Sequence, residues 1–177
     1  SQDIVIGFVE THGRQATEDQ IGALEVVPRK RIEYRGAIFE EMDTDAVLRR
    51  GPAIALVDEL AHTNVPGSEH EKRWQDVEVL LKRGISVLTT MNVQHLESLN
   101  DTVHDITGVW VRETVPDSIL RGADEVVLVD ITPEALINRL DRGDVYPRDK
   151  VNQARTGLFL EKVKKAAAVR IDALRLI

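Results

Sequence analysis

The sequence predicts an α/β protein in which a mostly parallel sheet is flanked by helices. Short aliphatic runs alternate along the 177-residue chain with stretches of helical periodicity, and this alternation is typical of parallel strands joined by crossover helices. The run at residues 53–57 is wholly apolar, as expected for a strand that is buried on both faces of a sheet. Aromatic residues make up only 4% of the chain, so the core must be mainly aliphatic.

The predicted elements follow one another in a regular order. Strands are predicted at residues 3–9, 32–35, 53–57, 85–91, 109–112 and 125–131, and the runs at 3–9, 85–91 and 125–131 have the aliphatic character of buried strands. Helices are predicted at residues 17–24, 40–49, 68–83 and 95–106, at 132 to about 143, and within 150–177.

Local signals place several helix boundaries. Gly51-Pro52 is a stop signal for the helix at 40–49. Ser68 and Glu71 have the spacing of a capping box, so the next helix is expected to begin at Ser68. Gly84 is expected to end that helix as a C-terminal cap. Thr132-Pro133 is typical of a helix start. Residues 60–67, between the strand at 53–57 and the helix at 68–83, are predicted as a loop.

Composition excludes several classes of function. The formal charge is −7, with 23 basic and 30 acidic residues, which argues against broad binding to nucleic acid or anionic membranes. The absence of cysteine excludes disulfides, thiolate catalysis and cysteine zinc sites. The histidines lack zinc-site spacing, and no apolar run reaches the roughly 18–20 residues of a membrane span. The chain is therefore expected to be soluble and cytoplasmic.

Two acidic residues, Asp58 and Glu59, directly follow the apolar run at 53–57. Ligands of open α/β sheets bind at the carboxyl ends of the strands, so a ligand crevice is expected here. Asp58 could hold Mg²⁺, and Glu59 could polarise an attacking water in a catalytic role. This is the pattern of the acidic half of a P-loop nucleotide site, although the chain has no G-x-x-x-x-G-K-[ST] loop. The alternative is a pair of solvated acids.

Further polar residues follow the strands and could contact or sense a phosphate. They are His62, Thr63 and Asn64 after Asp58, Thr90 and Asn92 after the strand at 85–91, and Arg14 after the strand at 3–9. Each also has a simpler explanation, such as a polar loop, or a helix N-cap at Asn92. Three polar strand ends favour one shared crevice over three unrelated loops. The charges of Lys72-Arg73 and of residues 112–117 are predicted to lie on the surface.

Several motifs together resemble a known family, the N-terminal cytoplasmic domain of KdpD-like sensor histidine kinases. The resemblance covers roughly residues 3–147, and its motifs occur in the family's order. The motifs are Val9-Glu-Thr-His-Gly-Arg14, Asp58-Glu-Leu-Ala-His-Thr-Asn64, Pro66-Gly-Ser68, Lys72-Arg-Trp-Gln-Asp76, Asn92-Val-Gln-His-Leu-Glu-Ser-Leu-Asn-Asp101 and Val111-Arg-Glu-Thr-Val-Pro-Asp117.

The resemblance implies a P-loop-type domain over residues 1–147 that binds ATP and Mg²⁺, followed by a helical segment at 148–177. Asp58 and Glu59 would be its Walker B acids, and the first strand and the Walker A loop would lie upstream of Asp3. In that family the cytoplasmic domain belongs to an inner-membrane kinase that responds to potassium limitation and osmotic stress. Its partners would be the rest of the kinase and, through it, a response regulator.

Other functions remain open from the sequence. The domain could be a docking module that binds no nucleotide, or a free-standing P-loop NTPase, and it could form a homodimer. Phosphotransfer chemistry is not expected within this segment. Residues 1–177 alone are expected to bind Mg-ATP weakly, since a Walker A loop supplies most phosphate contacts.

Overall fold

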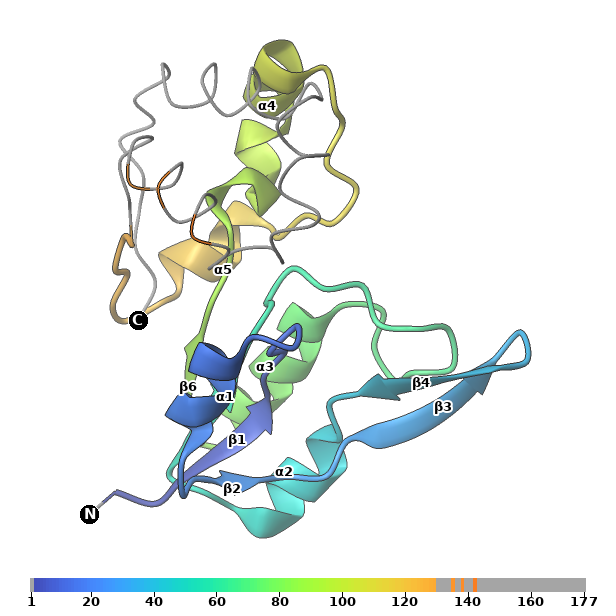
Figure 1. The fold of residues 1–177 in the computed structure, drawn as a ribbon, viewed down its shortest axis with the longest axis vertical. Helices are drawn as coiled ribbons and strands as arrows, with labels where there is room; N and C mark the ends of the chain where they lie inside the picture. The colour runs from blue at the N-terminus through green and yellow to red at the C-terminus, as the bar shows by residue number, and fades with distance from the viewer. Residues whose placement is uncertain (1, 130–134, 136–137, 139–141, 143–177) are drawn as a thin grey trace.

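The computed structural model describes residues 2–129 together with residues 135, 138 and 142. Within this part of the chain the main sheet has four parallel strands in the order β2-β1-β5-β6 (Figure 1). The strands are β1 at Ile4–Phe8, β2 at Glu25–Val26, β5 at Ile54–Val57 and β6 at Ser86–Thr89. The predicted α/β class with a mostly parallel sheet is confirmed, and the carboxyl ends of β1, β5 and β6 meet at one edge.

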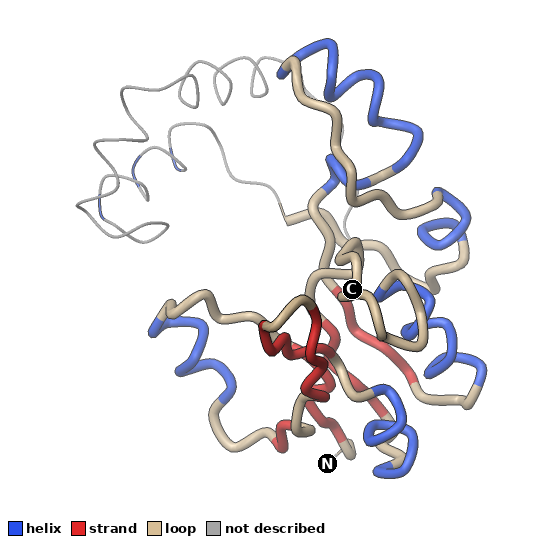
Figure 2. Tube along the Cα trace, turned by 90° about the vertical axis from the view of Figure 1, so that its right-hand side faces the viewer, coloured by secondary structure: helices blue, strands red, loops and turns tan. Residues whose placement is uncertain are grey.

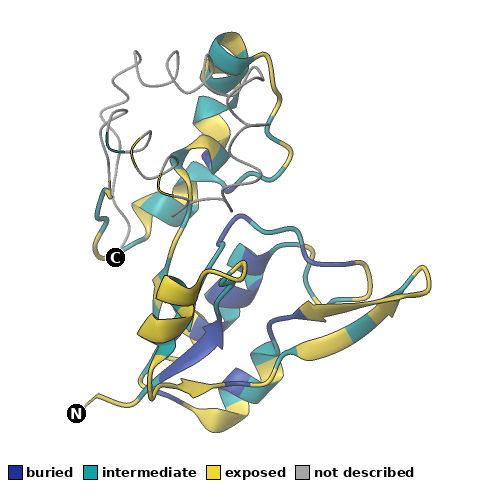
Figure 3. Ribbon diagram, viewed as in Figure 1, coloured by how far each residue is buried: buried dark blue, intermediate teal, exposed yellow. Residues whose placement is uncertain are grey.

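Helices lie on both sides of this sheet (Figure 2). α2 at Thr44–Arg50 and α3 at Arg73–Lys82 lie on one side, and α1 at Gln15–Ile21 lies on the other. The core contains the strand residues Val5, Ala55 and Val57, packed with Val47 of α2 and Leu80 of α3. α1 buries none of its residues. The tightly packed core is therefore on the side of α2 and α3, where the buried residues gather (Figure 3).

A two-stranded antiparallel hairpin projects from the body of the domain (Figure 1). It consists of β3 at Lys30–Tyr34 and β4 at Ala37–Glu41. The predicted helix start at residue 40 was wrong, since β4 runs to Glu41. α2 begins only at Thr44 because the Asp43 carboxylate accepts a hydrogen bond from the Ala46 amide at 2.8 Å and caps the helix there.

The helix predicted from Ser68 begins instead at Arg73. Residues 63–72 form a closed loop, in which Thr63 pairs with Lys72 in an antiparallel bridge and the Asn64 amide donates to the Glu71 carbonyl at 2.9 Å. Because the backbone before residue 73 is used in this loop, the helix is capped at Lys72, whose amide donates to the Gln75 side-chain oxygen at 2.9 Å, rather than by Ser68 and Glu71.

The strand at 85–91 is shorter than predicted and is not fully buried. β6 is the outer strand of the described sheet, and its residues alternate between exposed and half-buried. An outer strand has a neighbour on one side only, so an apolar run does not by itself show central burial. No described helix is long and apolar enough to cross a membrane.

The region after β6 differs most from the predictions. The helix expected at 95–106 is divided into two short 3₁₀ turns, Val93–His95 and Glu97–Leu99, followed by α4 at Asn100–Thr107. Residues 109–112 form no strand, because the Asn100 side chain exchanges hydrogen bonds with the Val111 backbone at 3.1 Å. A last short helix, α5, spans Asp117–Arg121.

The predicted strand at 125–131 is also wrong for its described part, since residues 125–129 lie in no strand and Val129 is 85% exposed. Residues 130 and 131 lie outside the described residues. The same holds for most of the helix predicted from 132 to 143, of which only residues 135, 138 and 142 are described, as helical. The segment at 148–177 lies wholly outside them.

Candidate functional site

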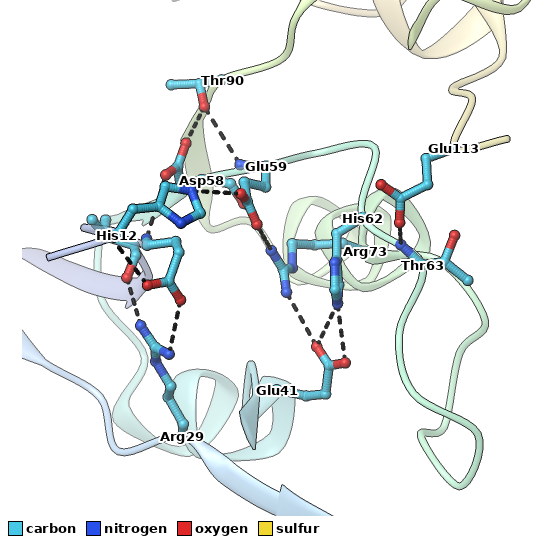
Figure 4. Close-up of polar contacts among 12 residues, drawn as sticks. His12, Arg29, Glu41, Asp58, Glu59, His62, Thr63, Arg73, Thr90 and Glu113 are labelled. Atoms are coloured by element: carbon cyan, nitrogen blue, oxygen red, sulfur yellow. Dashed lines mark hydrogen bonds and ion pairs between the residues drawn. The ribbon is translucent and has the colours of Figure 1, made fainter. Parts of the chain in front are cut away.

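Asp58 lies where the carboxyl ends of three strands converge (Figure 4). It follows β5, and its Oδ1 accepts a short hydrogen bond from the Thr90 hydroxyl, just after β6. Its Oδ2 faces the backbone amide of Glu10, after β1, at 3.4 Å. Residues that follow three separate strands thus lie together at this edge, as predicted.

Glu59 adopts a strained backbone conformation at the same edge. Its φ is 56°, and that of His12 is 51°, a left-handed region that costs energy for residues other than glycine. The His12 Nε2 lies 3.3 Å from the Glu59 carboxylate. Such strain tends to persist at functional sites, where the surrounding structure enforces it. We call Asp58 and Glu59 together the acidic turn.

Arg73, the first residue of α3, anchors the acidic turn from within the core. Its side chain is fully buried, donates to the Asp58 carbonyl at 3.2 Å and lies 3.6 Å from the Glu59 carboxylate. Its guanidinium also lies over the Phe8 ring, 3.7 Å from the ring centre. The prediction that Arg73 is a surface charge was therefore wrong. Burial lowers the pKa of Arg73, and the nearby carboxylates of Glu41 and Glu59 oppose this effect.

Glu41, at the end of the hairpin, is the second buried partner of Arg73. The two side chains are 3.1 Å apart, and Glu41 also accepts hydrogen bonds from the His62 ring at 3.0 Å and from the Val65 amide at 2.8 Å. Burial alone would raise the pKa of Glu41. The bonds from His62 and Val65 and the charge of Arg73 outweigh burial, so this pKa lies below its usual value.

This shift predicts how acid affects stability. A carboxylate with a lowered folded-state pKa stabilises the fold above its unfolded pKa of about 4.3, and the stabilisation is lost as the pH falls through the lower folded value. Between about pH 5 and pH 3, urea unfolding should therefore show a steeper loss of stability for the natural chain than for Glu41→Gln. Parallel curves would show that the Glu41 carboxylate is not stabilised in the fold.

The three predicted residues of the loop after the acidic turn face other partners. His62 bonds to Glu41, and the Thr63 hydroxyl accepts from the Lys72 ammonium at 2.6 Å. Asn64 is 7% exposed, and its side-chain amide donates to the Asp76 carboxylate at 2.7 Å. These contacts close the loop, so a phosphate role for His62, Thr63 or Asn64 stays a prediction and would require the loop to rearrange.

The remaining predicted residues are spread around the site. Thr90 contacts both residues of the acidic turn, since its hydroxyl also lies 3.4 Å from the Glu59 amide. Asn92 is exposed and does not cap the following 3₁₀ turn with its side chain. Arg14 is exposed at the start of α1, where it likewise makes no capping bond. Their roles toward a ligand stay predictions.

Of the charges in residues 112–117 that were predicted to lie on the surface, Glu113 is half-buried and bonded. Arg112 is exposed, but the Glu113 carboxylate accepts from the Thr63 amide at 2.9 Å, and Val115 is fully buried. This segment therefore contacts the loop that follows the acidic turn.

Sequence reasoning also missed the roles of Glu41 and Arg29 and the burial of Arg73. Arg29 contacts Glu10 at 3.2 Å and donates to the Val9 carbonyl at 2.7 Å. One signal was present for Arg73. Arg73, Val77 and Leu80 have the i, i+4, i+7 spacing of one helix face, and all three are buried. A charge at the first position of an apolar face is a candidate for burial with a partner.

Comparison with known proteins agrees with the family resemblance that the sequence motifs indicate. The family model described as "Osmosensitive K+ channel His kinase sensor domain", KdpD, matches residues 1–177. The chain belongs to the KdpD sensor domain family. The resemblance drawn from the motifs is thereby confirmed.

Curated KdpD proteins match most of the chain. The "Putative sensor protein KdpD" of Synechocystis is 55% identical over 173 residues, which cover 98% of this chain and 46% of the relative. The "Sensor protein KdpD" of Escherichia coli K12 is 57% identical over 152 residues, or 86% of this chain and 17% of the relative. That of Clostridium acetobutylicum is 47% identical over 174 residues, or 98% and 19%. The chain thus spans less than half the length of these KdpD relatives.

Proposed function

We propose that this KdpD-type domain is an ATP-responsive regulatory domain of a two-component sensor histidine kinase that responds to potassium limitation or osmotic stress. The observation that supports it is the convergence at Asp58 of groups that follow β1, β5 and β6. This edge of a parallel sheet is where open α/β folds bind their ligands. The strained acidic turn lies at the same place.

Mg²⁺ fits the residues that are present. It prefers oxygen ligands and is commonly held by one or two carboxylates together with substrate phosphates. Within the described residues no group of three or more metal-ligating side chains exists that could bind an ion without such phosphates. Asp58 would hold the ion, which would offset the charge of the phosphates. Each Asp58 oxygen accepts one contact and keeps a free lone pair.

The other groups of the site would act around that ion. Glu59 would orient water if hydrolysis occurs, and its carboxylate lies 3.3 Å from the His12 ring and 3.6 Å from Arg73. Thr90 would hold the Asp58 carboxylate in place. The phosphate cradle itself would come from a Walker A loop outside residues 1–177. Partners of the domain would be the rest of the sensor kinase and, through it, a response regulator.

One observation favours a docking module as the second candidate. The carboxylates of the acidic turn already have protein partners, because Asp58 is bonded to Thr90, and Glu59 lies close to Arg73 and His12. A site whose carboxylates are already engaged by protein groups could serve only to shape the loop that follows. In that case the domain would contact the kinase without a nucleotide.

Hydrogen exchange separates the two candidates. In a protein that extends this chain at its N-terminus, saturating Mg-ATP should lower amide exchange at residues 58–67 and 89–92, because an engaged Asp58 orders the loop beside it. α4, which lies away from the acidic turn, serves as the internal control. Unchanged exchange at residues 58–67 under saturating Mg-ATP would favour the docking module.

A further inference from the structure

Arg73 contacts two parts of the fold, the acidic turn and the end of the β3–β4 hairpin. One of its terminal nitrogens contacts the acidic turn, where it lies 3.2 Å from the Asp58 carbonyl oxygen and 3.6 Å from the Glu59 carboxylate. The other lies 3.1 Å from Glu41, at the end of β4. Figure 4 shows the guanidinium between the two carboxylates. A single buried cation is thus shared between the candidate ligand site and the hairpin.

Glu41, at the end of the β3–β4 hairpin, is the one residue of these two strands that is buried. Glu41 bonds there to Arg73, His62 and the Val65 amide. Further out, Ile38 is 60% exposed and Phe39 is 42% exposed, and the hairpin projects from the body of the domain (Figure 3). Elements with few buried contacts open at low energy. The position of the hairpin should therefore depend strongly on the bonds made by Glu41.

The sharing of Arg73 has an electrostatic consequence. A fully buried guanidinium is destabilising unless carboxylates compensate its charge, and here two carboxylates do so. If Glu59 turns toward a ligand, Arg73 must rely on Glu41 alone, and the bond at the hairpin base changes. The same argument applies in reverse, since coupling between two sites is reciprocal.

We propose that Arg73 couples the acidic turn to the β3–β4 hairpin, so that the hairpin reports whether the turn is engaged by a ligand. The nature of that ligand, a magnesium–nucleotide complex, rests on the proposed function. The coupling itself rests only on the contacts of Arg73. The domain would then present its ligand state to the rest of the kinase at a projecting element.

A double-mutant cycle tests the coupling without any nucleotide. Urea unfolding is measured for the 177-residue chain and for Glu59→Gln, Glu41→Gln and the double variant. The unfolding constant of the double variant should exceed the value expected from multiplying the two single effects, by a factor on the order of ten. The reason is that either carboxylate alone can still compensate the charge of Arg73, whereas the double variant removes the charges of both Glu41 and Glu59.

Glu40→Gln is the matched control, because Glu40 is exposed beside Glu41 on β4 and its ion pair is a distant one with Arg29 at 3.8 Å. The effects of Glu40→Gln and Glu59→Gln on the unfolding constant should multiply in the double variant. If Glu41→Gln does not fold, Glu41→Asp replaces it, since the shorter side chain keeps the charge but loosens its contact with Arg73. Effects that multiply in both cycles would overturn the proposed coupling.

Hydrogen exchange then connects the coupling to the ligand. In the longer protein, Mg-ATP should change exchange at residues 30–41 by severalfold, and Glu41→Gln should abolish this change while protection at residues 58–67 persists. Protection at 58–67 with no change in the hairpin would overturn the coupling and leave the proposed function intact. A cycle that shows coupling, with no protection at 58–67, would support the coupling and contradict ATP binding.

Discussion

Replacing Arg73 with Met should lower the free energy of unfolding by about 3–5 kcal/mol, because removing one partner of a buried ion pair leaves the other charge without compensation. The stranded group is Glu41, which is only 5% exposed. The side chain of Met fills a similar volume, so the loss of charge rather than a cavity dominates. Equilibrium urea unfolding of the two chains measures the effect.

Arg83→Met is the control for this prediction, since Arg83 is exposed at the end of the same helix. Its effect should stay within about 0.5 kcal/mol, as is usual for surface positions. Pairing Arg73→Met with Glu41→Leu should recover part of the lost stability, because an apolar pair removes the stranded charge. A loss below about 1 kcal/mol for Arg73→Met would contradict the role of Arg73 as a buried anchor.

Replacing Phe8 with Ala should lower the free energy of unfolding by about 3–5 kcal/mol, the usual range for a buried phenylalanine. Phe8 is 5% exposed and packs in the core. Its ring also lies below the Arg73 guanidinium at 3.7 Å and near that of Arg29 at 4.4 Å. A desolvated cation over an aromatic face contributes about 2 kcal/mol or more.

Phe8→Leu separates packing from the cation–ring contact. Leucine keeps most of the apolar volume but offers no ring face, so we expect a smaller loss, about 1–2 kcal/mol. In an Arg73→Met background the stability lost on Phe8→Leu should shrink. An equal loss in both backgrounds would show that the Phe8 ring does not stabilise the Arg73 charge.

The sequence predicted the part of the fold that depends on local apolar runs. The strands at the start of the chain and before Asp58 were identified because their residues are aliphatic and bounded by turn signals. The hairpin was only half predicted, since Ile38 and Phe39 of β4 are exposed and followed by two glutamates. β4 forms by pairing with β3, and the Asp43 cap delays the start of the following helix. A periodic pattern reveals neither of these.

The candidate site was predicted in part for a similar reason. Strand order brings Asp58 and Thr90 together, and both were expected from the rule that strand ends form ligand sites. The bonds of Asn64 to Asp76 and of His62 to Glu41 depend on how the loop folds back on itself. Long-range contacts between charged residues carry no sequence period. The burial of Arg73 was therefore recognisable only from its place on the apolar face of α3.

We propose that Asp58 takes part in binding a magnesium–nucleotide complex. Calorimetric titration of Mg-ATP into a protein that extends this chain at its N-terminus tests it directly, with Asp58→Asn as the variant and Asp19→Asn, at an exposed position of α1, as the control. We expect micromolar binding, about −8 kcal/mol, that weakens tenfold or more and loses its dependence on Mg²⁺ in Asp58→Asn only. Equal affinities and equal Mg²⁺ dependence in all three proteins would show that Asp58 has no part in binding the nucleotide.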